Sequence, residues 1–202
     1  MRKYQLTSRD IRIILDVYKY RYLTVSQVWT LHFRSQRTAH RRLQALGILG
    51  YLKGFLVPHI PERIFYLDKP GAEVVALELQ TTIEALHWNR YTKAPKDYYF
   101  IRHFLAINDF RILLTLACRE NSMTLVGFIP EYYGEKTREG NVVKYLRDRV
   151  CDMTNHTRQL SHTPDAVFAL EKAGNAALFF VEIDRGGEIL VAPHQTVERV
   201  EL

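Results

Sequence analysis

The sequence predicts a mixed α+β fold built from two consecutive parts. Helical patterns dominate the first 80 residues and return over about residues 98–120. Short β-prone runs lie near residues 48–67, 124–129 and 166–183. Charge divides the chain in the same way: residues 1–80 hold 13 Lys and Arg against 6 Asp and Glu, whereas residues 81–202 hold 15 against 16. A basic part joined to a neutral part suggests that the first binds a polyanion.

Two capping boxes predict the first two helices. Thr7 is followed three residues later by Asp10, and Thr24 is followed by Gln27. In such a pair, each side chain accepts a hydrogen bond from a backbone N–H that the helix start leaves without a partner. Apolar residues then continue each helix: Ile11, Ile14, Leu15 and Tyr18 in the first, and Val28, Trp29 and Leu31 in the second.

A third helix is predicted from an N-cap at Ser35 to about Leu46, with Gly47 as a left-handed cap. One face is apolar and the other is basic and rich in hydrogen-bond donors. Arg and Gln are the side chains that read guanine and adenine edges with two hydrogen bonds each. No acidic residue lies between Arg34 and Tyr51. The apolar face comprises Ala39, Leu43 and Leu46, and the basic face Arg37, Thr38, Arg41, Arg42 and Gln44.

Two β-prone runs, Ile48–Val57 and Arg63–Leu67, predict a hairpin with a Pro-containing connection. Lys69-Pro70-Gly71 punctuates the chain, and Ala72–Leu79 is predicted as a fourth helix. Three helices, a hairpin and a return helix indicate a winged helix-turn-helix in residues 1–80. The alternative is a winged helix that contacts protein. The residues predicted to contact DNA are Arg34, Gln36, Arg37, Thr38, Arg41, Arg42, Gln44, Lys53, His59 and Arg63.

Residues 81–97 are interpreted as a helix end and linker, and residues 98–202 as a second, small α/β domain. This domain is predicted to contain a helix over about 98–120, a strand over 124–129 and a mobile excursion over 130–160. It closes with a hairpin of strands Ala166–Leu170 and Ala176–Ile183.

Asp165, Glu182 and Asp184 flank the last two strands in a pattern that resembles the PD-(D/E)xK, or restriction-endonuclease-like, core. In that core two carboxylates, here Asp165 and Glu182, hold a divalent ion such as Mg²⁺ that activates water. The position of the usual lysine is Asp184, followed by Arg185. We therefore expect a nuclease-like domain without catalysis and without a cofactor. The three acids stay catalytic candidates, with Mg²⁺ as the metal, should the domain cleave DNA.

The composition excludes several other classes of protein. No run of 18 apolar residues exists, and the basic N-terminus lacks the apolar stretch of a secretory signal. Two distant cysteines, Cys118 and Cys151, are typical of reduced thiols. We therefore expect a cytoplasmic protein without membrane association. A glycine-rich phosphate loop is also missing, so ATP use has no support.

Several motifs together resemble the replication-relaxation family of plasmids and integrative elements. The match extends over nearly the whole chain, and the segments that carry it are Leu6–Asp10, Tyr22–Thr24 with Gln27, Arg41–Leu43 with Leu46-Gly47, Tyr66-Leu67 with Gly71, His103–Asp109, Pro164–Phe168, and Val181–Gly186. The resemblance implies a winged helix with a second α/β domain and a role in plasmid replication or DNA relaxation.

The function predicted from these features is that of a DNA-binding accessory protein of plasmid or mobile-element replication, relaxation or mobilisation. A transcriptional regulator is the first alternative and a Mg²⁺-dependent nuclease the second. The expected partner is double-stranded DNA, with other replication or relaxosome proteins as further candidates. A homodimer is also considered, because one winged helix covers a small footprint. A nuclease-like core usually has a covering helix after its strands, so we also expect that the chain could be a fragment of a longer protein.

Overall fold

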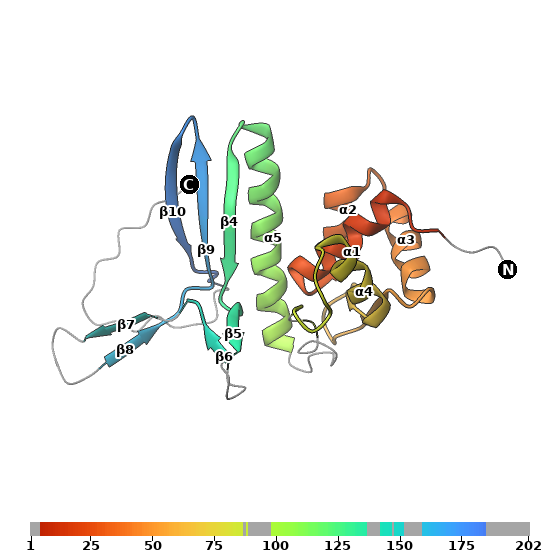
Figure 1. Ribbon diagram of the computed structural model, residues 1–202, viewed down its shortest axis with the longest axis horizontal. Helices are drawn as coiled ribbons and strands as arrows, with labels where there is room; N and C mark the ends of the chain where they lie inside the picture. The colour runs from red at the N-terminus through yellow and green to blue at the C-terminus, as the bar shows by residue number, and fades with distance from the viewer. Residues whose placement is uncertain are drawn as a thin grey trace.

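The computed structural model describes residues 5–86, 88, 98–136, 142–146, 148–151 and 159–184. These residues form helices and small antiparallel sheets, which confirms the predicted α+β class (Figure 1). The helices are α1 (Ser8–Tyr20), α2 (Val25–His32), α3 (Gln36–Ile48), α4 (Lys69–Glu78) and α5 (Tyr98–Glu120). The strands are β1 (Leu23–Thr24), β2 (Leu52–Phe55), β3 (Ile64–Leu67), β4 (Thr124–Pro130), β5 (Gly134–Lys136), β6 (Val142–Lys144), β7 (Asp148–Cys151), β8 (Gln159–His162), β9 (Ala166–Lys172) and β10 (Asn175–Val181).

Both predicted capping boxes are present. The Thr7 side chain accepts a hydrogen bond from the backbone N–H of Asp10, and the Asp10 carboxylate accepts one from the backbone N–H of Thr7. Thr24 and Gln27 exchange the same two bonds at the start of α2. The two helices therefore begin where the sequence predicts, because each start carries its own partners for the unpaired N–H groups.

The end of α3 differs from the prediction. Gly47 lies inside the helix, and the left-handed residue is Gly50, with φ of +79°. The N–H of Tyr51 donates to the carbonyl of Leu46, and the N–H of Gly50 donates to the carbonyl of Gly47, both at 3.0 Å. This is a Schellman ending, and it needs glycine at the position that Gly50 occupies. At the other end, Ser35 precedes the helix but its side chain makes no capping hydrogen bond.

The predicted hairpin is confirmed as β2 and β3, which pair antiparallel from Leu52 opposite Leu67 to Phe55 opposite Ile64. The short strand β1 adds a third member on the other side of β3. Thr24 is also the N-cap of α2, and a strand of two residues is too short for the sequence pattern to reveal.

Helix α4 begins at Lys69, three residues earlier than predicted. Lys69-Pro70-Gly71 is its first turn and not a break, because Asp68 caps the helix and proline is tolerated where the N–H has no helical partner. Gly71 is required by a close approach: a Cβ built on it would lie 2.3 Å from the carbonyl oxygen of Tyr51.

Helix α5 has the predicted bounds and stands between the two halves of the molecule (Figure 1). On one side, Ile101, Phe104 and Leu105 pack with Tyr22 and Ile64 from the first 80 residues. On the other side, Ile107 packs against apolar side chains of the sheet whose strand order is β10-β9-β4. One helix therefore belongs to the cores of both halves.

Residues 130–160, predicted as a mobile excursion, contain β5 paired with β6, and β7 paired with the start of β8. These hairpins are short and polar, so the sequence has no apolar alternation to reveal them. The predicted linker over 81–97 and the residues after Asp184 lie mostly or wholly outside the described residues.

Within the part of the chain that the structure describes, no helix is both long enough and apolar enough to cross a membrane.

Candidate nucleic-acid interface

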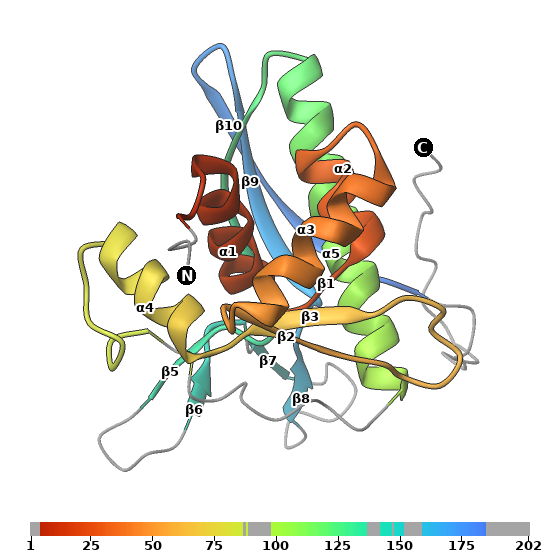
Figure 2. The ribbon, with the colours of Figure 1, turned by 90° about the vertical axis from the view of Figure 1, so that its right-hand side faces the viewer.

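Helix α3 has one buried face and one basic face, as the sequence predicts. Ala39, Leu43 and Leu46 are fully buried against the core of the first 80 residues. Arg37 and Arg41 are exposed on the remaining surface. Figure 2 shows that α3 lies on the side of the molecule turned away from the β4–β9–β10 sheet. The basic face is therefore accessible to a large partner.

Four of the predicted DNA-contacting side chains are exposed polar groups without an internal partner. Within the described residues, the side chains of Arg34, Arg37, Arg41 and Gln44 make no hydrogen bond or ion pair. Three arginines and one amide on or next to a single helix are donors with the reach to contact phosphates and base edges.

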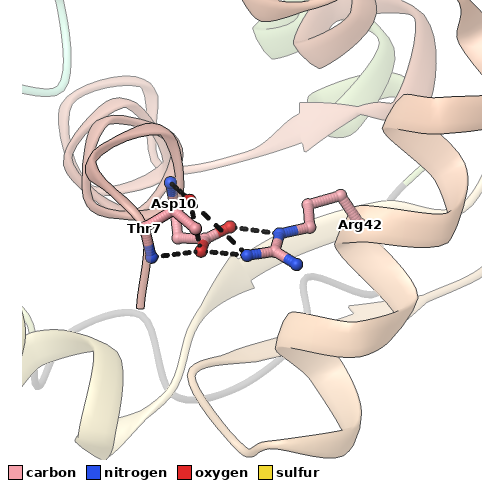
Figure 3. Close-up of polar contacts among 3 residues, drawn as sticks. All are labelled: Thr7, Asp10 and Arg42. Atoms are coloured by element: carbon pink, nitrogen blue, oxygen red, sulfur yellow. Dashed lines mark hydrogen bonds and ion pairs between the residues drawn. The ribbon is translucent and has the colours of Figure 1, made fainter. Parts of the chain in front are cut away.

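Arg42 has a different place in the fold. Its guanidinium donates hydrogen bonds to both carboxylate oxygens of Asp10, which lies on α1 (Figure 3). The Asp10 side chain is fully buried, and Thr7 donates to the same carboxylate from its hydroxyl and its N–H, each at 2.7 Å. Arg42 thus ties α3 to the capped start of α1, and only about a quarter of its side chain, 27%, stays exposed.

The electrostatics of this contact favour the charged carboxylate. Burial alone raises the pKa of Asp10, but the hydrogen bonds from Arg42 and Thr7 outweigh it. The pKa of Asp10 therefore lies below its ordinary value, and the ion pair is intact at neutral pH.

The remaining predicted DNA contacts already have neighbours. Gln36 donates to the Ser26 hydroxyl at 3.2 Å. Lys53 lies 3.0 Å from Asp68, and this ion pair raises the pKa of Lys53. The ring of His59 contacts Tyr98 at the start of α5, and the exposed side chain of Arg63 lies across Gly54. Thr38 is half-buried.

A hollow of about 600 Å³ opens between the end of α2 and the start of α3. Arg34 and Thr38 line it, together with Arg9 from α1, whose guanidinium lies 5.1 Å above the Phe33 ring. The sequence pattern did not single out Arg9, because on α1 it reads as one cation of an ordinary solvated face.

The acids of the nuclease-like pattern lie at one end of the sheet. One oxygen of Asp165 is 2.8 Å from Nε2 of His103 on α5, and the other accepts from the backbone N–H of Ile183 at 2.6 Å. Asp165 thereby links α5 to the ends of β9 and β10. Glu182 and Asp184 follow β10 and are exposed. Among the described residues, no group of three or more His, Cys, Asp or Glu side chains is arranged to hold a metal ion.

The segments on which the family resemblance depends contact one another across the fold. Gln27 donates to the carboxylate of Asp109 at 2.7 Å and to the carbonyl of Leu105 at 3.1 Å. Asn108 donates to the carbonyls of Tyr20 and Tyr22 at 3.1 and 2.7 Å. With the pair His103–Asp165, these bonds place many of the motif residues in contacts between α5 and the elements on both of its sides. The pair Asp10–Arg42 joins α1 to α3 within the first 80 residues.

Similarity to a known protein family covers most of the chain. The model of the replication-relaxation family matches residues 15–201, and the chain belongs to that family. No curated protein and no solved structure shows significant similarity to this chain.

Proposed function

We propose that residues 1–80 form a winged helix-turn-helix that binds duplex DNA through α3, in a cytoplasmic accessory protein of plasmid or mobile-element replication, relaxation or mobilisation. The order α1, α2, α3 and the β2–β3 hairpin supports the fold. Membership of the replication-relaxation family supports the process.

The observation that carries the proposal is the exposed basic face of α3. Arg37 and Arg41 lie one turn apart, Gln44 continues the same row, and α3 contains no acidic residue. A protein-binding helix more often mixes both signs of charge. A helix of this kind enters the major groove with its first turns, where arginine and glutamine reach base edges.

The structure changes how the proposal should be tested. Arg42 stabilises the fold through Asp10, so its removal would lower DNA binding for the wrong reason. The informative variant is Arg37→Ala/Arg41→Ala, compared with the wild type by fluorescence anisotropy on duplex DNA at several salt concentrations. We expect its Kd to rise about ten-fold or more and its salt dependence to fall by roughly two counterions.

The matched control is Arg102→Ala/Arg119→Ala, which removes the same charge from exposed positions on α5. This control should bind DNA nearly as tightly as the wild type. Equal losses in both double variants would mean that net charge alone drives binding. Unchanged binding in Arg37→Ala/Arg41→Ala would contradict the proposal and leave the winged helix as a protein-contact module.

The alternatives predict different outcomes with natural DNA. Footprints at repeated sites near a replication origin would support the accessory role, whereas a footprint over a promoter would support a transcriptional regulator. A nuclease would cleave DNA with Mg²⁺ and lose cleavage in Asp165→Ala. Because Asp165 also links α5 to the sheet, the assay includes Glu182→Ala as a second variant, at an exposed position.

A further inference from the structure

The strand β10 forms one edge of the β10-β9-β4 sheet. Its seven residues contain no charge and no proline, and three large apolar side chains are exposed: Leu178 by 62%, Phe179 by 41% and Phe180 by 71%. Within the described residues, β10 pairs with β9 on one side and with no strand on the other. Natural sheet edges usually carry a charge, a proline or a bulge that prevents pairing with another strand, and β10 has none of these.

The opposite edge of the same sheet is protected. The register of β4 against β9 shifts between Leu125 and Gly127, and the strand ends at Pro130. A bulge twists the edge, and proline cannot donate to a new strand. The sheet can therefore be extended through β10 and not through β4.

The backbone of β10 is oriented for such an extension. The carbonyl of Val181 accepts a hydrogen bond from the N–H of Asp165, which follows on from the pairing with β9. Because both polar groups of a residue in an antiparallel strand point to the same side and alternate along it, those of Ala176, Leu178 and Phe180 point to the open edge.

We propose that β10 pairs antiparallel with β10 of a second copy of this chain, about a two-fold axis at Leu178. This register places Leu178 opposite its own symmetry mate. It sets Ala177 opposite Phe179 and Ala176 opposite Phe180, so each large ring faces a small side chain. An uncharged strand whose large and small residues complement each other in this way matches a copy of itself.

The charge distribution also favours a second copy of this chain. The excess positive charge lies in residues 1–80, while residues 81–202 carry 15 basic and 16 acidic residues. The nearly neutral second halves of two copies therefore do not repel each other. Helix α3 and β10 lie at opposite ends of the molecule (Figure 1). A two-fold axis perpendicular to the sheet keeps both α5 helices on one face of a six-stranded sheet, so both basic regions lie on that side. The outer edges of this six-stranded sheet are the two protected β4 strands, so no third copy can be added.

The test is the oligomeric state of the full chain without DNA, measured by sedimentation velocity over a range of micromolar concentrations. We expect a dimer of twice 23.7 kDa. Leu178→Lys and Leu178→Asp each place two like charges against one another across the axis, and each should weaken dimerisation by about ten-fold or more. An equimolar mixture of the two variants should restore the dimer, because opposite charges then face each other.

Val126→Lys is the matched control, since it adds the same charge to an equally exposed position, 59%, on the protected edge. It should dimerise like the wild type. A wild type that stays monomeric, larger species that grow with concentration, a dimer that survives Leu178→Lys, or a mixture that does not recover would each overturn the proposal. Circular dichroism checks that the variants are folded. The result is independent of the DNA-binding proposal, because no residue of α3 is changed.

Discussion

The guanidinium of Arg42 on α3 binds the fully buried carboxylate of Asp10 on α1, at the capped start of that helix. A basic side chain that the sequence assigns to a DNA surface is thus part of the frame that holds this surface. Two neighbouring arginines therefore have different roles. The side chain of Arg41 is exposed, whereas the side chain of Arg42 is held in a contact within the fold.

The first prediction follows from that difference. Arg42→Ala should lower the free energy of unfolding by about 3 kcal/mol, because it leaves a buried carboxylate without its counter-charge. Arg41→Ala should change it by less than about 0.5 kcal/mol, since the side chain is exposed. Urea unfolding followed by circular dichroism measures both values. Similar stability of the two variants would show that the ion pair does not fix α3.

The second prediction concerns acid stability. Since the folded protein holds the pKa of Asp10 below its ordinary value of 3.8, the ion pair stabilises the fold fully above that pH. Its contribution is lost as the pH falls through the lower, folded pKa. Below pH 3.8 the wild type should therefore lose stability more steeply than Asp10→Asn, which has no carboxylate to protonate. Unfolding curves at stepwise lower pH measure the two slopes, and parallel slopes would contradict the prediction.

The third prediction concerns Asp109, whose pKa is shifted upward, so that its effect on stability changes with pH in the opposite direction to that of Asp10. Partial burial raises the pKa of Asp109, although the hydrogen bond from Gln27 partly compensates. The folded state then holds this proton more tightly than the unfolded state, so the contribution of Asp109 to stability falls as the pH rises above 3.8. Asp109→Asn retains an acceptor for Gln27 and should be more stable relative to the wild type at neutral pH than at pH 3. The exposed substitution Glu73→Gln should show no such trend in the same thermal melts.

The fourth prediction tests the close packing of α4. Gly71→Ala should destabilise the protein by about 1–3 kcal/mol, because the added Cβ meets the carbonyl oxygen of Tyr51. Gly127→Ala is the matched control, since a Cβ there has no neighbour within 4 Å. Chemical unfolding of both variants decides the point, and a neutral Gly71→Ala would mean that the start of α4 can shift.

The sequence predicted those features whose causes lie close together in the chain. The two capping boxes, the bounds of α5 and the two faces of α3 depend on residues within a few turns of one another. The structure added features whose causes lie far apart. Arg42 and Asp10 are separated by 32 residues, and no local pattern distinguishes Arg42 from Arg41. The close approach of Gly71 to Tyr51 depends likewise on the tertiary fold.

The candidate site was likewise predictable only in its local features. Periodicity placed the basic face on α3, but it could not tell which cations the fold already uses. Lys53 meets Asp68 only because β2 pairs with β3, and Arg9 reaches the hollow beside α3 only because α1 packs there.

Helix α5 supplies side chains to the cores on both of its sides, and this has a consequence for how the protein can be handled. A fragment ending near residue 80 would leave Tyr22, Val57, Ile64 and Tyr66 facing water where Ile101 and Phe104 now cover them. Such a fragment should be poorly soluble, although its local patterns look self-sufficient.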